Sequence, residues 1–370
     1  MKRIGIFQLY HESGKVEEYV EKLLAEMARV VSKVVIVCNG ALEEKEYSKL
    51  KQYSNAVYGR ANIGYDAGGY KDIFLTLHKE DWNQWDEAVM FNCSFYGPIC
   101  SLENVFNTMD REDVDFWGLS RHLGDRPMRK GGPEIPEHLQ SYFLVVRRSM
   151  LQSVHFWEFW RKLDYPQSYY EAVENFEWKF TLSFKNKNFR YTSWLDVMGA
   201  DTVIGKGINP WADRAYDIIS TFGFPIVKCK AMSIANFGEM KKIMLFLERN
   251  TTYPIELIIN HIKHLNSENK WKPYSVNILE KFVKSHNRIF IFGNGKYGKG
   301  LGEWFRHRKW EFENYVVSVP CSEDEIAFDD FSMCVKDGLI VALGRKALDE
   351  MEHMIRCKFK EDQLLFPLLS

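Results

Sequence analysis

The nine residues Asn62-Ile-Gly-Tyr-Asp-Ala-Gly-Gly-Tyr70 combine three glycines, an amide and a carboxylate just ahead of an amphipathic run. Glycine lets the backbone approach a ligand closely, and Asn62 and Asp66 supply directional hydrogen bonds. Residues 71–77 predict the first turns of a helix, whose free N–H groups would favour an anion at the end of the loop. The stretch is therefore typical of a loop that holds a phosphate-bearing ligand. A plain strand-to-helix turn is the competing interpretation.

Strand and helix patterns alternate on both sides of this loop. Apolar runs at residues 4–9, 33–38, 55–58 and 87–91 predict buried strands, and the apolar spacing over residues 16–27 predicts an amphipathic helix. Such alternation builds a doubly wound α/β sheet, which binds its ligands at the carboxyl ends of the strands. The candidate substrate-binding residues at those ends are Tyr10, Asn39, Asn62, Gly64, Asp66, Gly68, Gly69, Asn92, Ser94 and Tyr96.

The pattern continues to about residue 265. Residues 116–119 and 141–146 predict two more strands, and residues 149–187 are mostly helical by pattern. The charged segment 123–136 is rich in Gly and Pro and predicts a long loop. Loops of that length inside a compact domain are usually functional or mobile. A late helix is predicted over residues 253–265.

The strand pattern restarts near residue 284. Residues 288–292 predict a strand, and Gly293-Asn-Gly-Lys-Tyr-Gly298 matches GxGxxG at the start of a helix. Residues 315–319 and 338–343 predict two more strands of a small Rossmann-like α/β unit. We therefore expect two domains, residues 1–270 and residues 285–370.

Gly293, Gly295 and Gly298 are candidate cofactor-binding residues of the second unit. A dinucleotide site also needs an acidic residue after its second strand, and Val317-Ser-Val-Pro320 contains none. This disfavours a nicotinamide-dependent oxidoreductase, a function that would require NAD to bind at the glycine loop. Regulatory, nucleotide-binding and purely structural roles stay open for the unit.

Composition narrows the classes of partner. The 49 basic and 50 acidic residues nearly balance, which disfavours nucleic acid and strong attraction to an anionic membrane. The seven cysteines, an odd number, show no CxxC pair and indicate reduced thiols. The N-terminus passes directly into a strand-like run, and no segment is long enough to span a bilayer. We expect a cytoplasmic protein that can work beside the inner face of the cell membrane.

The segment after the strand at 87–91 bears on sugar chemistry. Glycosyl transfer from a nucleotide sugar needs groups that hold the diphosphate, groups that orient the sugar and a base for the acceptor hydroxyl. Many such enzymes hold the diphosphate through a divalent cation on two carboxylates, which suit hard cations. Here Asn92-Cys-Ser94 offers an amide, a thiol and a hydroxyl instead.

Four motifs in this order resemble the rhamnan synthesis F protein family: Asn62–Asp72, Asn92–Pro98, Asp115–Leu119 and His138–Phe143. The resemblance covers most of residues 1–265. Members of that family are rhamnosyl or related glycosyltransferases of bacterial cell-surface polysaccharide assembly, similar in fold to inverting GT-A enzymes. The resemblance therefore implies an α/β, GT-A-like domain with a mixed sheet, followed by the Rossmann-like unit.

The resemblance also implies roles for single residues. Asn62, Asp66 and Gly68 would line the donor site, and Asn92 and Ser94 would take the place of the metal-binding acidic motif. The family commonly shows Asn-Asp-Ser there, so the cysteine at position 93 leaves a requirement for Mg²⁺ or Mn²⁺ open. Candidates for a compensating positive charge are Arg121, Arg126, Arg129 and Lys130.

Three residues are candidate catalytic bases. Glu174 and Glu177 follow the strand at 141–146 at about the interval where GT-A enzymes place their carboxylate, and on an α-helix they would share a face. Glu174 is the preferred base, and both could instead be solvent-exposed helix charges. His138 is the rival. Gln140 and Ser141, just after it, complete the candidate substrate-binding set.

The function expected from the sequence is transfer of a sugar from a nucleotide-diphosphate donor to an oligosaccharide or lipid-linked glycan. The resemblance suggests a dTDP-rhamnose-like donor. The alternative is a non-catalytic sugar-nucleotide or glycan-binding subunit of a polysaccharide synthesis complex, because Asn92-Cys-Ser94 lacks the acidic pair.

Overall fold

A computed structural model describes residues 1–10, 14–127, 132–200, 205, 209–232, 237–267 and 276–366. The chain divides into two compact units, residues 1–228 with 251–253 and residues 229–250 with 254–370. This division assigns α12 (Phe237–Asn250) and α13 (Glu256–Ser267) to the second unit. The domain limits 1–270 and 285–370 stay a prediction.

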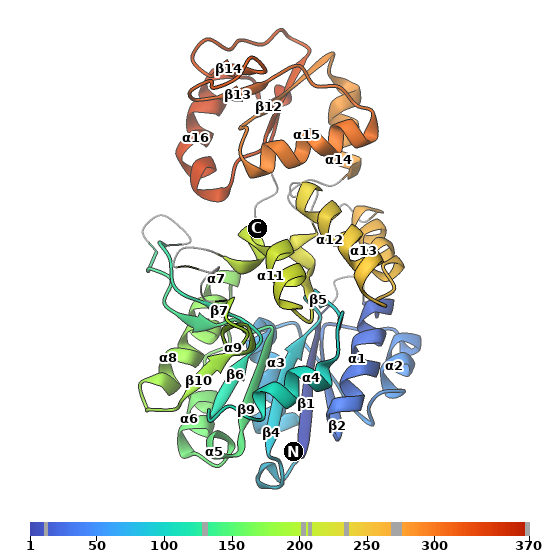
Figure 1. Ribbon diagram of the computed structural model, residues 1–370, viewed down its shortest axis with the longest axis vertical. Helices are drawn as coiled ribbons and strands as arrows, with labels where there is room; N and C mark the ends of the chain where they lie inside the picture. The colour runs from blue at the N-terminus through green and yellow to red at the C-terminus, as the bar shows by residue number, and fades with distance from the viewer. Residues whose placement is uncertain are drawn as a thin grey trace. The chain divides into compact units, whose positions relative to one another are not determined.

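The described part of the first unit is built on a seven-stranded sheet of order β10-β6-β9-β4-β1-β2-β3 (Figure 1). β1 to β4 run parallel, whereas β9 is antiparallel to both β4 and β6. The sheet is therefore mixed, which confirms the expected α/β class. The strands are β1 (Arg3–Tyr10), β2 (Lys33–Asn39), β3 (Ala56–Arg60), β4 (Glu87–Asn92), β6 (Phe116–Gly118), β9 (Phe143–Arg147) and β10 (Tyr191–Ser193).

The helix after β3 begins earlier than the sequence predicted. Helical turns were expected from residue 71, but α3 (Tyr65–Asp72) begins inside the glycine-rich motif and continues as a π-helical segment over Ile73–Leu77. Gly64 precedes it in the left-handed conformation, at φ 76°, which glycine adopts without strain. A Cβ atom on Gly69 would lie 3.0 Å from Gln8 Cγ, so this glycine lets α3 pack closely on the sheet.

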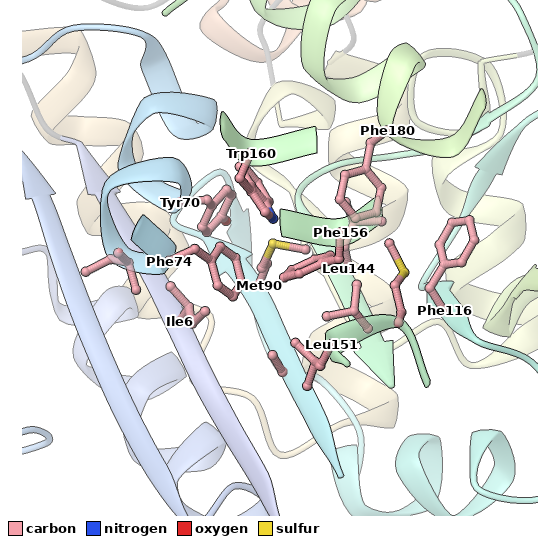
Figure 2. Close-up of a cluster of buried hydrophobic side chains, with 14 of the residues drawn as sticks. Ile6, Tyr70, Phe74, Met90, Phe116, Leu144, Leu151, Phe156, Trp160 and Phe180 are labelled. Atoms are coloured by element: carbon pink, nitrogen blue, oxygen red, sulfur yellow. The ribbon is translucent and has the colours of Figure 1, made fainter. Parts of the chain in front are cut away.

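An aromatic core fills the space between the sheet and the helices α3, α6 (Val154–Lys162) and α8 (Lys179–Lys185), as Figure 2 shows. Phe74 stacks on Trp160 with ring centroids 5.0 Å apart and meets Phe156 edge-on at the same distance. Each such pair adds about 0.5–1.5 kcal/mol beyond the area it buries. The core fixes α3, and with it Asp66, against the sheet.

The opposite face of the sheet is covered by α1 (Glu18–Val30) and α4 (Leu102–Met109). α1 begins two residues later than its apolar pattern predicted. Phe106 of α4 packs on Phe143 and Trp117. The remaining elements of this unit are α2 (Glu44–Lys51), β5 (Phe95–Tyr96), β7 (Arg121–His122), β8 (His138–Leu139), α5 (Arg148–Leu151), α7 (Tyr169–Ala172), α9 (Trp194–Val197), α10 (Pro210–Asp213), α11 (Ala215–Phe222) and β11 (Val227–Lys228).

The segment predicted as a long loop is partly paired. An isolated bridge joins Asp125 to Ile135 inside the predicted loop, and the antiparallel strands β7 and β8 flank it. Arg121, a candidate compensating charge, already lies 2.7 Å from Glu137 and 3.0 Å from Asp196. Arg129 and Lys130 lie outside the described residues.

The second unit contains a parallel sheet of order β14-β13-β12-β15-β16 in its described part. The order, with the first strand in the middle, is that of a Rossmann-like unit. The strand predicted over residues 315–319 ends at Val317, and β14 and β16 escaped prediction because they are short. The remaining elements are α14 (Val276–Ser285), β12 (Arg288–Phe292), α15 (Lys296–Arg308), β13 (Tyr315–Val317), β14 (Glu325–Ala327), β15 (Asp337–Val341), α16 (Arg345–Lys358) and β16 (Leu364–Leu365).

No helix in the described ranges is both long and apolar enough to cross a membrane. The seven cysteines, all within the described ranges, form no disulfide in the structure.

Candidate active site

A pocket of about 320 Å³ lies at the carboxyl ends of β1, β2 and β3. Five of the residues that the sequence selected gather in its wall: Tyr10, Asn39, Asn62, Gly64 and Asp66. Ile63, Tyr65, Pro166 and Gln167 complete the wall and were not predicted. Pro166 and Gln167 come from the connection between α6 and α7, about a hundred residues away, and no local motif marks them.

Asn39 holds the start of α3 in place. Its Nδ2 donates to the carbonyl of Tyr65 at 2.9 Å, and its Oδ1 accepts from Arg60 Nη1 at 2.8 Å. Arg60 also donates to Asp72 on α3 at 2.6 Å. The end of β2 and the end of β3 are thereby tied to the helix that carries Asp66.

Asp66 joins this pocket to the end of β4. Its Oδ2 accepts a hydrogen bond of 2.5 Å from Nδ2 of Asn92. Burial raises the pKa of the Asp66 carboxyl to about 6, although the bond from Asn92 and the charge of Lys228 act in the opposite direction; the nearby charge of Glu177 adds to the rise. A carboxyl group that titrates near neutrality is suited to proton transfer.

Polar contacts continue from Asn92 to a lysine. Oδ1 of Asn92 accepts from the backbone N–H of Ser94 at 3.0 Å and from its hydroxyl at 2.6 Å. Nζ of Lys228 donates to Ser94 Oγ at 2.6 Å and lies 4.2 Å from the ring centroid of Tyr142. Lys228 reaches this position because β11 pairs antiparallel with β5. Lys228 was not among the residues predicted from the sequence.

A second group surrounds Glu177. Its Oε2 accepts from the N–H and the hydroxyl of Ser141, at 2.8 and 2.5 Å, and its Oε1 lies 3.3 Å from Nε2 of His138. Burial would raise the pKa of Glu177, but the bonds from His138 and Ser141 outweigh it and lower the pKa to about 2. Nδ1 of His138 lies 2.7 Å from the carbonyl of Pro136, so both ring nitrogens face oxygen acceptors.

Glu174 lies with Glu177 on a π-helical segment over Val173–Trp178 and is partly buried. The two carboxylates were expected three residues apart on an α-helix. In a π-helix the turn is wider, so this spacing no longer aligns two side chains as it does on an α-helix. The contacts with Ser141 and His138 are made by Glu177.

The other predicted residues of the first unit lie around these groups. Tyr96 is fully buried and packs edge-on against Tyr19, and Oε1 of Gln140 accepts from Ser120 at 2.7 Å. Gly68 is a helical residue whose added Cβ would lie 2.4 Å from the carbonyl oxygen of Ile63. Close packing therefore accounts for Gly68 and Gly69.

Backbone conformation and close packing also account for glycines in the loop of the second unit. Gly293 has φ 97°, and a Cβ on Gly298 would lie 1.8 Å from the Gly293 carbonyl oxygen. Gly295 is the N-cap residue of α15, and nothing lies within 4 Å of a Cβ added there. Glu325 accepts 2.5 Å hydrogen bonds from Asn294 Nδ2 and from the N–H of Cys321.

The residues at the end of β4 do not fit a divalent cation. Asn92 Oδ1 is used by Ser94, and the thiol of Cys93 faces the carbonyl of Tyr10 at 3.5 Å. The ammonium of Lys228 occupies the other side of Ser94. Within the described ranges, no three His, Cys, Asp or Glu side chains gather as metal ligands.

The family model for rhamnan synthesis protein F matches residues 34–294, more than half of the chain. The chain belongs to this family. The match confirms the resemblance that four motifs indicated, and it extends through β12 to Asn294 in the glycine loop of the second unit.

One curated relative of this chain is an uncharacterized protein, y4gN, of Sinorhizobium fredii (strain NBRC 101917 / NGR234). It is 29% identical over 193 residues, which cover 51% of this chain and 48% of that protein. The chain therefore spans about half the length of this relative.

Solved structures match this chain only at low similarity. The 4-diphosphocytidyl-2C-methyl-D-erythritol synthase of Anaerococcus prevotii DSM 20548 has a TM-score of 0.34 at 10% identity, over 55% of this chain and 96% of that one. Core-mannan synthase A of Aspergillus fumigatus has a TM-score of 0.28 at 8% identity, over 51% and 70%. The family assignment rests on the family model and not on these structures.

Proposed function

We propose that this member of the rhamnan synthesis F family is a glycosyltransferase, which moves a sugar from a nucleotide-diphosphate donor to a growing cell-surface polysaccharide. The observation that carries the proposal is the position of Asp66. Asp66 lines the pocket of about 320 Å³, and its carboxylate accepts a hydrogen bond from Asn92. This residue thus connects a nucleotide-sized cavity with the strand end that replaces the acidic motif.

In this proposal the nucleoside occupies the pocket beside Tyr10. The side chain of Tyr10 is 41% exposed, and an exposed aromatic ring at a pocket wall can stack on a nucleobase. The diphosphate would then point toward Asn92 and Ser94 at the end of β4. The sugar would lie between the diphosphate and Asp66.

For the base we favour Asp66 over the three residues that the sequence suggested. The carboxyl of Asp66 has a pKa of about 6, close to the pH at which an intracellular base must work. Glu177, with a pKa of about 2, accepts protons poorly, and its contacts with Ser141 and His138 suit a positioning role. Glu174 is the alternative base.

The proposed reaction is a single displacement. The Asp66 carboxylate takes the proton of an acceptor hydroxyl, and the hydroxyl oxygen forms a bond to the anomeric carbon. The bond between that carbon and the phosphate oxygen breaks, and its electron pair leaves with the nucleoside diphosphate. The configuration at the anomeric carbon is inverted because the nucleophile enters opposite the leaving group.

A deoxythymidine-diphosphate rhamnose is the donor that the family suggests, and an oligosaccharide or lipid-linked glycan at the inner face of the membrane is the acceptor. These assignments rest on the family description, rhamnan synthesis protein F. They are proposals for a chain that spans about half of its curated relative.

Incubation with a panel of nucleotide sugars tests the function and the base together. We expect release of nucleoside diphosphate by the wild type, with a loss of about 10²–10⁴-fold in Asp66→Asn. Glu174→Gln is the matched control and should retain most of the rate. If Glu174→Gln loses activity and Asp66→Asn does not, the base is Glu174.

A non-catalytic binding subunit is the second candidate. It is favoured by the residues at the end of β4, where amide, thiol and hydroxyl groups replace carboxylates. This candidate predicts tight binding of a nucleotide sugar, with no release of nucleoside diphosphate in any acceptor mixture. Equilibrium titration alongside the turnover assay separates the two functions.

A further inference from the structure

The ammonium group of Lys228 lies at the end of β4, where many nucleotide-sugar transferases carry an acidic metal motif. Lys228 is 134 residues from Ser94 in sequence, yet its Nζ donates to Ser94 Oγ at 2.6 Å. The same hydroxyl donates to Asn92, which in turn donates to Asp66. The positive charge therefore belongs to the same chain of contacts as the candidate base.

The position of this ammonium is defined by the fold. The backbone of Lys228 pairs with Phe95 in the ladder between β11 and β5, directly after Ser94. Its Nζ lies 4.2 Å from the ring centroid of Tyr142, within cation–π range. Tyr142 is buried, and its hydroxyl is in hydrogen-bond contact with Ser120. A flexible lysine is thereby directed toward one point at the site.

The same contacts disfavour a divalent cation. A cation bound to Ser94 would lie beside the Lys228 ammonium, and like charges repel strongly in a partly buried site. Asn92 uses its oxygen for Ser94, and Cys93 directs its thiol to Tyr10. A diphosphate, in contrast, would gain a charge-assisted hydrogen bond from an ammonium that is already in place.

We propose that Lys228 takes the place of the metal ion, and that the protein binds the diphosphate of its nucleotide ligand without a divalent cation. The inference rests on the proposed function, because it assumes that the pocket beside Asp66 takes a nucleoside diphosphate. During transfer, the ammonium offsets the charge that develops on the leaving phosphate oxygen.

Calorimetric titration of the full chain with dTDP, UDP, GDP and inorganic pyrophosphate tests this inference. Each probe is titrated in excess EDTA and again with Mg²⁺ or Mn²⁺. We expect at least one nucleoside diphosphate to bind with the same Kd, within about twofold, under both conditions. Lys228→Met should weaken that binding about tenfold or more, whereas Lys228→Arg should stay within a few-fold of the wild type.

Lys230→Met, two residues further and exposed, is the matched control and should bind as the wild type does. If Lys228→Met does not fold, the comparison of EDTA with metal in the wild type still decides the matter. Nucleotide binding that requires the metal ion overturns the inference about Lys228 and leaves the proposed function intact. Unchanged affinity in a folded Lys228→Met variant has the same two consequences. No binding of any probe under either condition overturns both.

Discussion

Nδ2 of Asn92 donates a 2.5 Å hydrogen bond to Oδ2 of Asp66, which joins the start of α3 to the end of β4. The bond brings together the two motifs on which the sequence analysis relied most. It also places an uncharged donor beside a carboxyl group whose pKa is about 6. An aspartate at position 92 would instead face Asp66 as a second carboxylate.

Replacing Asp66 by Asn should stabilise the protein at neutral pH. The pKa of Asp66 in the folded protein, about 6, lies above the usual value near 4, so the folded protein binds this proton more tightly than the unfolded chain does. Stability therefore falls as pH rises from 4 to 6. Above pH 6 the ionised group costs about 1–3 kcal/mol. Urea unfolding at pH 7 and at pH 4 measures this: the gain of Asp66→Asn should be present at pH 7 and absent at pH 4. Equal gains at both pH values would show that ionisation is not the cause.

Glu177 should behave in the opposite way. Its folded pKa, about 2, lies below the unfolded value, so it stabilises the fold above about pH 4.5, and this contribution is lost as pH falls toward 2. Glu177→Gln should lower the free energy of unfolding at pH 7 by about 1–3 kcal/mol, with the difference shrinking at pH 3. Glu158→Gln, whose side chain is 42% exposed, is the control and should change stability by less than about 0.5 kcal/mol.

Gly64 and Gly40 form a matched pair for the turn that precedes α3. Both have positive φ, 76° and 89°, but an added Cβ at Gly64 would lie 2.8 Å from Tyr165 Cδ1, whereas nothing lies within 4 Å at Gly40. Gly40→Ala should cost about 1–2 kcal/mol from the backbone alone. Gly64→Ala should cost about 1–3 kcal/mol more through overpacking. Denaturation midpoints with unchanged slopes provide the comparison. Equal losses of stability in the two variants would mean that the Tyr165 side chain moves aside at no cost in free energy.

The second unit should not bind NAD. Glu325, the acidic residue beside the glycine loop, already accepts bonds from Asn294 and from the N–H of Cys321. A ribose hydroxyl would have to displace them. Titration with NAD up to millimolar concentration is expected to give no signal, and saturable binding would revive the oxidoreductase that the sequence disfavours.

The sequence predicted the strands that frame the site better than the role of each glycine. The apolar runs of β1, β2 and β4 are continuous because these strands are buried on both faces. Gly68 and Gly69 suggested a loop, but they lie in α3, where the absence of Cβ atoms allows close packing. A local pattern does not distinguish a glycine that turns the chain from one that packs in a helix.

Residues brought in by long-range contacts could not be predicted. Lys228 meets Ser94 through the pairing of two-residue strands, and Gln167 reaches the pocket from the connection that follows α6. Neither lies in a motif. The expectation that Glu174 and Glu177 share a face rested on α-helical spacing, which the π-helical turn at Val173–Trp178 does not keep.

The pH dependence of donor consumption tests whether sugar transfer takes place beside Asp66. The initial rate of nucleoside diphosphate release from the preferred nucleotide sugar is measured between pH 4.5 and 8, as kcat/KM. Because Asp66 must be ionised to accept a proton, the rate should rise with pH through an apparent pKa of about 6 and level off above it. If the wild-type protein binds nucleotide sugars yet releases no nucleoside diphosphate at any pH, no sugar is transferred beside Asp66.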